Sequence, residues 1–340
     1  MPRKTFIKLA YLLVLVIPIA CFSRGGNDAS VAVSADGYIK WVDFNATSDI
    51  MRAALKCDLE SYEKHKADPS VGHAEFVTLI ALAATKYGGE FTGCKATDIT
   101  AFAERLMAGE SPEVIAGELA GGGKYYPYFL EAYGAVLGGF VGRYAVTEND
   151  MLSTRYGLKV FSPIAAGYYY RDFDDYGAAR SYGYRRPHLG HDLMGSVGTP
   201  IVAVESGYVE SCGWNQYGGW RIGIRSYDGK RYYYYAHLQK GHPYNDIYEG
   251  KQVNAGEVIG YLGMTGYSAK EDVNNIDTPH LHFGVQLIFD KSQKDGTNQI
   301  WIDLYEYTKF LSKYRSEVTY DKNTGEFSAV DPIIDLNAPD

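Results

Sequence analysis

Five of the eight histidines in this 340-residue chain fall in three short segments of its C-terminal half. These segments are "PHLGHDLM" with His188 and His191, "YYYYAHL" with His237, and "PHLHF" with His280 and His282. Imidazole groups bind zinc and exchange protons near neutral pH. The clustering therefore indicates a metal site or an acid–base centre.

The segment "PHLHF" is expected to be a β-strand. Side chains alternate between the two faces of a strand, so His280, His282 and Gly284 would share one face. The opposite face would carry three apolar residues, Leu281, Phe283 and Val285. An apolar face suits a core, so the histidine face is predicted to open onto a groove.

The same alternation in "YYYYAHL" would put Tyr235 and His237 on one face. Two such strands lying side by side could bring three imidazoles together. The third segment adds a carboxylate, because Asp192 follows His188 by four residues. Gly190 and the downstream "GSVGTP" favour a loop that runs into a strand over a helix.

Zinc takes three or four N, O or S ligands in a tetrahedron and keeps one position open in catalytic sites. His188, Asp192 and His282 would supply a site of two histidines and one aspartate. His237 and His280 would then remain beside it for proton transfer and charge stabilisation.

Less specific interpretations apply to each motif taken alone. A single histidine in a strand is more often a satisfied polar residue than a ligand, and an HxxxD spacing by itself is weak. A purely structural zinc site usually has four protein ligands, and only His191 is at hand as a fourth. The co-occurrence of all three motifs within one β-rich segment favours the metal site.

The elements that would position these residues lie in a glycine-punctuated region, 155–315. Short β-rich runs separated by glycine turns predict an antiparallel β domain, with Asp228-Gly229 as a hairpin turn. A helix is expected within 301–314. The last residues, 316–340, are expected to form a loosely ordered tail.

A helical region, 41–145, precedes the β domain. Apolar stripes at helical spacing predict four or five short helices, with caps at Ser48 and Ser111 and a stop at Gly88. They suggest a small bundle without chemistry of its own. Cys57 and Cys94 could form a disulfide or stay free, because the sequence does not give their separation.

The N-terminus has the pattern of an export signal. Arg3, Lys4 and Lys8 precede or interrupt the start of an apolar run that ends at Phe22. Residues 1–23 are thus predicted to be a cleaved signal peptide or a membrane anchor, followed by a linker, 24–40. The rest of the chain would lie outside the cytoplasm. The net charge of −8 gives no global electrostatic case for binding nucleic acid.

Four separated motifs across 161–290 resemble the M23 (LytM/lysostaphin-type) zinc metallopeptidases. They are "HLGHDLMGSVGTPIVAVESGYV", "YYAHL", "GEVIGYLGMTGYS" and "PHLHFGV". In style the chain is similar to membrane-anchored or secreted members from clostridia-type Gram-positive bacteria. The insert "AKEDVNNIDT" before His280 is longer than the minimal pattern. The helical region and the residues after Asp290 lie outside the resemblance.

The resemblance implies a small antiparallel β-sandwich with a groove over one sheet. Together with the helical bundle predicted before it, this makes α+β the expected fold class. The resemblance also implies one Zn²⁺ held by His188, Asp192 and His282, with His237 and His280 as catalytic residues. The implied activity is endopeptidase cleavage of the peptide part of peptidoglycan. It would take place at the outer face of the cytoplasmic membrane, in the wall or after secretion.

Two questions stay open under this resemblance. Tyr217, Tyr235 and Tyr267 could line the substrate groove or pack within the sheet. The fold also serves in non-catalytic modules that bind the wall or a partner protein. Such modules lack a ligand, and none is missing in this chain. His191 falls at a variable position of HxxxD and is not implied as a ligand.

Overall fold

The computed structural model describes residues 40–42, 44–121, 123–148, 151–182, 184–294 and 298–338. The predicted leader, 1–23, and nearly all of the predicted linker lie outside these residues. Within the described part, none of the helices combines the length and the apolar character needed to cross a membrane.

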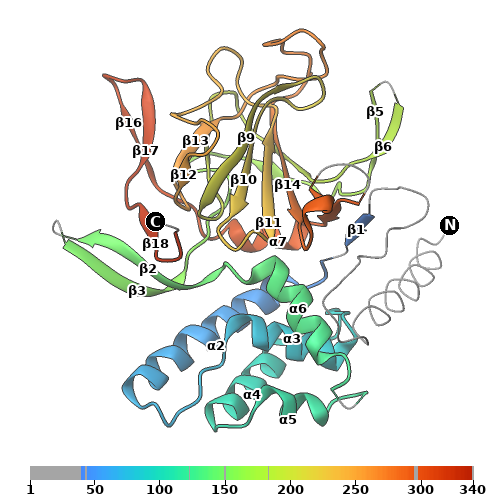
Figure 1. Ribbon diagram of the computed structural model, residues 1–340, viewed down its shortest axis with the longest axis vertical. Helices are drawn as coiled ribbons and strands as arrows, with labels where there is room; N and C mark the ends of the chain where they lie inside the picture. Colours follow the sequence, from blue (N-terminus) through green and yellow to red (C-terminus); the bar gives the residue numbers. More distant parts are fainter. Residues whose placement is uncertain are drawn as a thin grey trace.

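Five helices form the lower part of the molecule in Figure 1. They are α2 (Ser48–Ala67), α3 (Phe76–Tyr87), α4 (Ala96–Met107), α5 (Pro112–Gly117) and α6 (Tyr126–Leu137). Gly88 ends α3 in a left-handed conformation, and Ser111 caps α5, as predicted. The cap of α2 is Thr47, whose side chain accepts from the Ile50 N–H, and not Ser48.

One nine-stranded sheet forms the centre of the β domain. Its main path runs β1-β15-β14-β11-β10-β9-β12, with β7 beside β14 and β4 beside β7. All pairs are antiparallel except β1 with β15. The strands are β1 (Lys40–Val42), β4 (Arg171–Asp172), β7 (His191–Met194), β9 (Gly207–Asn215), β10 (Gly219–Ser226), β11 (Arg231–Ala236), β12 (Gln252–Val253), β14 (His280–Leu287) and β15 (Ile300–Ile302).

Smaller sheets surround this one. They comprise β2 (Val141–Glu148), β3 (Met151–Leu158) and β18 (Ile333–Asp335); β5 (Ala179–Tyr182) and β6 (Tyr184–Pro187); β8 (Pro200–Val202) and β13 (Val258–Tyr261); and β16 (Val318–Asp321) and β17 (Glu326–Ala329). A 3₁₀ turn, η1, spans Lys291–Gln293. The predicted α+β arrangement, helices before an antiparallel β domain, is confirmed.

The C-terminal part is more regular than the sequence suggested. The helix predicted within 301–314 is present as α7 (Tyr305–Leu311). It begins only at Tyr305, because the residues before it form β15 of the central sheet. The tail forms three strands, and β18 pairs with β2. Asp335 of β18 accepts hydrogen bonds from Lys159 at 2.7 and 2.9 Å, and both side chains are buried.

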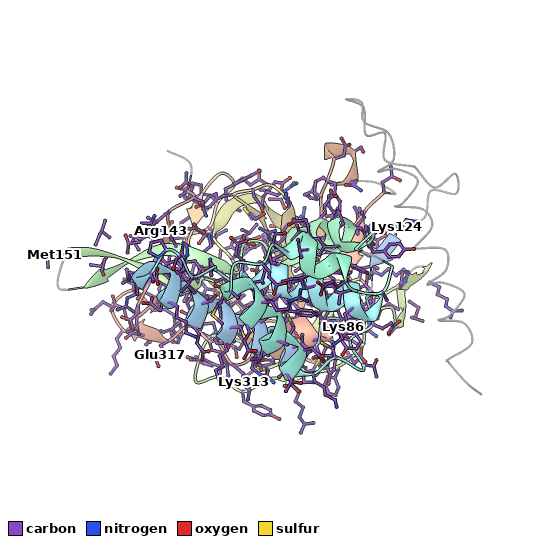
Figure 2. The ribbon with its side chains drawn as sticks, turned by 90° about the horizontal axis from the view of Figure 1, so that it is seen from below. Lys86, Lys124, Arg143, Met151, Lys313 and Glu317 are labelled. Carbon is purple, nitrogen blue, oxygen red and sulfur yellow. The ribbon has the colours of Figure 1, made fainter. Side chains whose placement is uncertain are left out.

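The helices and the central sheet share one hydrophobic core. Phe140, just after α6, packs edge-on against Tyr307 of α7 at 5.1 Å between ring centroids. Seen from below, the helices spread across the underside of the molecule, and Met151 marks the projecting end of the β2–β3 hairpin (Figure 2). The described cysteines Cys57, Cys94 and Cys212 are free, so the possible bond between Cys57 and Cys94 is not formed.

A buried ion pair lies where the helices meet the sheet. Arg231, at the start of β11, is 1% exposed and donates to both oxygens of Glu205 at 2.7 and 3.0 Å. It also donates to the Ala135 carbonyl of α6 at 2.7 Å. The histidine cluster lies at the opposite end of these strands, where Ala236 pairs with His282.

Candidate metal centre

Strand pairing brings the metal-site residues together. His282 of β14 and Asp192 of β7 are direct cross-strand partners. His188 reaches them from the loop before β7, and this loop passes very close to β14. A Cβ at Gly190 would lie 2.6 Å from the Phe283 carbonyl oxygen and 2.8 Å from Cε1 of His282. Glycine at this position therefore lets the loop approach.

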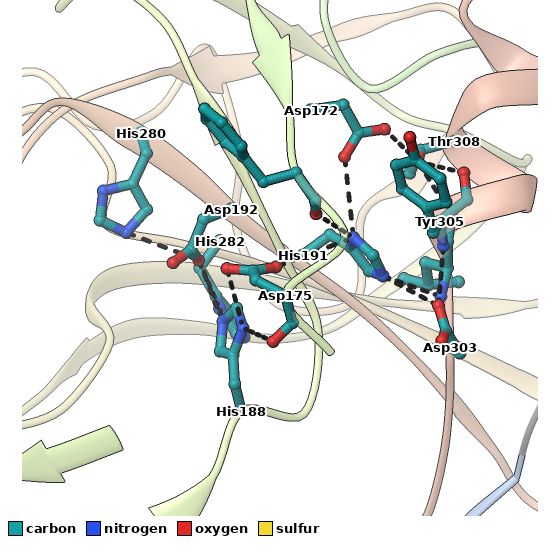
Figure 3. A network of polar contacts seen from close by, with 12 residues as sticks. Asp172, Asp175, His188, His191, Asp192, His280, His282, Asp303, Tyr305 and Thr308 are labelled. Atoms are coloured by element: carbon teal, nitrogen blue, oxygen red, sulfur yellow. Dashed lines mark hydrogen bonds and ion pairs between the residues drawn. The ribbon is translucent and has the colours of Figure 1, made fainter. Parts of the chain in front are cut away.

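Three donor atoms converge on one point (Figure 3). Nε2 of His188 lies 2.8 Å from Nδ1 of His282 and 3.0 Å from Oδ1 of Asp192. Nδ1 of His282 lies 3.2 Å from the same Asp192 oxygen. Zinc bonds to these atoms at tetrahedral angles would separate the donors by about 3.4 Å, so small outward movements would suit the ion. Among the described residues, this is the one group of three such side chains that could hold a metal.

The other polar atoms of Asp192 and His188 are held by a second set of residues. Oδ2 of Asp192 accepts from Nη2 of Arg180 at 2.9 Å. Nδ1 of His188 lies 3.2 Å from Oδ2 of Asp175, which also accepts from Arg180 at 2.6 Å. These contacts leave Nε2 of His188 and Oδ1 of Asp192 directed at the centre. Neither residue was predicted, because Asp175 comes from an irregular segment and Arg180 from β5, a strand of four residues.

The electrostatics suit a cation. Burial would raise the pKa of Asp192, but hydrogen bonds to His188 and His282 hold it well below its usual range. Burial is the main reason that the pKa of His282 falls to about 4. The pKa of His188 is raised, because hydrogen bonds to Asp175 and Asp192 outweigh its burial. An ionised carboxylate and a neutral imidazole are the forms that bind metal, so the shifts of Asp192 and His282 favour binding, whereas a metal would have to displace the proton that the raised pKa of His188 favours.

The two predicted catalytic histidines stand beside the centre, and each has its Nδ1 against a backbone carbonyl. Nδ1 of His237 lies 2.8 Å from the Thr265 carbonyl, and Nδ1 of His280 lies 2.8 Å from the Thr278 carbonyl. A carbonyl can only accept, so each Nδ1 carries the proton and each Nε2 is left to face the site. The two rings lie 4.8 Å apart, and Nε2 of His280 is 3.6 Å from Oδ1 of Asp192.

Burial and the neighbouring His280 and His282 lower the pKa of His237 well below its usual range. The imidazole is therefore neutral at physiological pH. Its unprotonated Nε2 can accept a proton.

The prediction that Tyr235 lines the groove is wrong. Strand β11 ends at Ala236, and His237 has φ of 63°, so the alternation assumed between Tyr235 and His237 is broken there. Tyr235 is fully buried in the core, and its hydroxyl accepts from the Val204 N–H at 2.9 Å. Tyr234 faces the centre instead, with its ring 5.9 Å from that of His282.

Tyr217 and Tyr267 lie at the rim of the centre, and both are half-buried. The Tyr267 ring packs edge-on against His237 at 5.8 Å between centroids. The guanidinium of Arg186 lies over both tyrosine rings, 4.9 Å from that of Tyr217 and 5.7 Å from that of Tyr267. These contacts suit the predicted role of the two tyrosines in a groove.

His191 lies apart from the centre, on the right of Figure 3. Its Nδ1 is 3.0 Å from the Phe173 carbonyl and its Nε2 is 3.1 Å from Oδ1 of Asp303. Burial opposes its charged form, but hydrogen bonds to Asp172 and Asp303 raise its pKa to about 10. His191 thus ties β7 to the segment before α7, which agrees with its not being a predicted ligand.

Comparison with known proteins finds relatives of the segment that carries these residues. Residues 186–296 match the model of Peptidase family M23. The L-Ala–D-Glu endopeptidase of Bacillus subtilis is 37% identical over 156 residues, which cover 45% of this chain and 43% of that protein. Lysostaphin of Staphylococcus simulans is 41% identical over 97 residues, 28% of this chain and 17% of that protein. The matched segments thus span less than half of either relative.

A solved structure of a lytM-like protein from Ruminococcus gnavus is 24% identical, with a TM-score of 0.46 over 80% of this chain and 94% of that one. Residues 186–296 form a Peptidase family M23 domain, homologous to the LytM/lysostaphin-type enzymes.

Proposed function

We propose that the protein is a zinc-dependent endopeptidase that cleaves peptide bonds of peptidoglycan. The observation that carries the proposal is the convergence of the donor atoms of His188, Asp192 and His282, with His237 and His280 beside them. The names of two relatives support the substrate class, because one is a peptidoglycan DD-endopeptidase and the other is an L-Ala–D-Glu endopeptidase.

In this proposal His188, Asp192 and His282 would hold one zinc ion. When bound, zinc supplies Lewis acidity, which polarises a carbonyl group and makes a water molecule more acidic. Nε2 of His237 or His280 accepts the proton of the attacking water. The resulting imidazolium can donate a hydrogen bond to the developing oxyanion and then protonate the leaving amine.

The location of the activity follows from the predicted leader. Export of the chain would place the catalytic domain on the same side of the cytoplasmic membrane as peptidoglycan: at the outer face of that membrane, in the wall or in the medium. We likewise propose the division into a leader, a linker, a helical region, a peptidase domain and a tail. The helical region and the peptidase domain share one hydrophobic core.

Purified residues 38–340 should release amino groups from cell walls, and a chelator should stop the release. We expect His188→Ala to lose zinc, because two ligands remain. His280→Ala should keep zinc but lose about 10²- to 10⁴-fold in rate. Loss of metal in His280→Ala with retention in His282→Ala would invert the assigned roles.

Mass spectrometry of the released fragments would name the bond. Wall binding without any release, in a protein that contains zinc, would instead indicate a non-catalytic binding module.

A further inference from the structure

Two arginines lie directly opposite one another in the β5–β6 hairpin, just before the metal ligand His188. Arg180 and Arg186 are cross-strand partners, so their side chains project from the same face of the hairpin. Arg180 is engaged with two carboxylates, those of Asp175 and Asp192. Arg186 has no ion pair with a carboxylate among the residues that the structure describes.

The surroundings of Arg186 orient its charge without neutralising it. Its guanidinium lies over the rings of Tyr217 and Tyr267, and its Nη2 is 3.4 Å from the Tyr267 hydroxyl. Aromatic rings attract a guanidinium but carry no negative charge. A guanidinium that stacks on rings still has N–H groups in its plane, which can bind a ligand.

Arg186 lies next to the side chains that flank the metal centre. Tyr267, which it contacts, packs on His237. A peptide held at the metal centre would therefore run past this guanidinium.

We propose that Arg186, positioned by Tyr217 and Tyr267, is a carboxylate-binding subsite that selects peptides with a free carboxylate close to the scissile bond. The proposal rests on the proposed function, since it takes the metal centre as the cleavage site. A planar guanidinium binds a carboxylate through two parallel hydrogen bonds, whereas a carboxamide offers one acceptor and no charge. Uncharged bridges, such as runs of glycine, would be poorer substrates.

The test uses two wall peptides that differ only in one glutamate carboxylate, which is either free or amidated. The zinc-loaded full chain should prefer the free form by about 10- to 100-fold in kcat/KM, the range expected for a hydrogen-bonded charge pair. Arg186→Gln should bring this ratio close to one. Added salt should lower the ratio for the wild type.

Arg185→Gln is the matched control. Arg185 is the neighbouring residue, is exposed, and pairs with Ser181 on the other face of the hairpin. It should keep the wild-type ratio. Arg186→Lys keeps the charge without the planar fork, so it should show an intermediate ratio if Arg186→Gln proves poorly folded.

An equal rate for both peptides in the wild type, or an unchanged ratio in Arg186→Gln, would overturn the proposal. If the wild type cleaves neither peptide, the proposed function fails for them, and calorimetry on the same samples decides the role of Arg186. Tighter binding of the free carboxylate by the wild type than by Arg186→Gln would support the subsite. Equal binding would refute it.

Discussion

Two of the proposed metal ligands, Asp192 and His188, each direct one polar atom at the centre and have the other near a second group. Asp192 gives Oδ1 to the centre and Oδ2 to Arg180, while His188 gives Nε2 to the centre and faces Asp175 with Nδ1. A carboxylate behind a histidine ligand fixes its tautomer and makes it a stronger base. Asp175 is therefore a positioning residue whose effect passes through His188.

Replacing Asp175 by asparagine should weaken zinc binding without unfolding the protein. The amide keeps the shape but loses the charge that faces Nδ1 of His188 and pairs with Arg180. Zinc affinity, measured by competition with a chromophoric chelator, should fall about 10- to 100-fold. Asp174→Asn is the control, since Asp174 is the exposed neighbour. An unchanged affinity in Asp175→Asn would show that the contact is incidental.

Among the elements, the pairing of β7 with β14 and the loop before β7 build the centre. This geometry depends on the absence of a side chain at Gly190, because the loop crosses over the ring of His282 and the backbone of Phe283. The backbone carbonyl of Phe283 is part of the central sheet and cannot move aside cheaply. The approach of His188 to His282 is therefore set by backbone packing.

Gly190→Ala should displace the loop from β14. The added Cβ would lie 2.6 Å from a backbone oxygen, so His188 must move away from His282. We expect a loss of stability of about 1–3 kcal/mol, typical of overpacking, and weaker zinc binding in the same variant. Gly117→Ala in α5, where a Cβ would meet open space, is the control for the substitution itself. Wild-type zinc affinity in Gly190→Ala would contradict the importance of this close approach.

Regular strands explain which parts of the site were predictable. In β14 one face is apolar and the other carries histidines, so alternation alone placed His280 and His282 correctly. In β11 the same rule failed, because His237 has a left-handed backbone conformation that non-glycine residues seldom adopt. Asp175 and Arg180 belong to segments without periodicity, so no local pattern connected them to the ligands.

At the scale of the whole molecule, the helices and the sheet form one packed body. The sequence suggested two separate regions because each has its own periodicity. The contacts that join them are long-range, such as the hydrogen bond from Arg231 to the Ala135 carbonyl, and local patterns do not show them. The metal centre lies at the other end of β11. We therefore expect that substitutions at the buried Arg231–Glu205 pair leave the metal centre unchanged.

The substitution Glu205→Gln tests whether the helices and the sheet unfold together and whether the metal centre is independent of the buried ion pair. Glu205 is 4% exposed and accepts from Arg231 and from the Tyr233 hydroxyl. Its neutralisation leaves the buried guanidinium with Asp228, whose side chain is partly exposed, as its one remaining counter-charge among the described residues. Removal of one partner of a buried ion pair typically costs about 3–5 kcal/mol of unfolding free energy. Denaturant unfolding should show this loss as one cooperative transition in both the wild type and the variant, because the core is shared. Zinc affinity at 25 °C should stay at the wild-type value.

The double variant Glu205→Leu with Arg231→Met separates the charge effect from packing. With both charges removed, an apolar pair of similar volume should recover most of the lost stability. Two unfolding transitions, with the helices melting before the sheet, would contradict the single packed body and restore the view of two independent domains. A loss of zinc affinity in Glu205→Gln would show that the Arg231–Glu205 pair and the metal centre are coupled through β11.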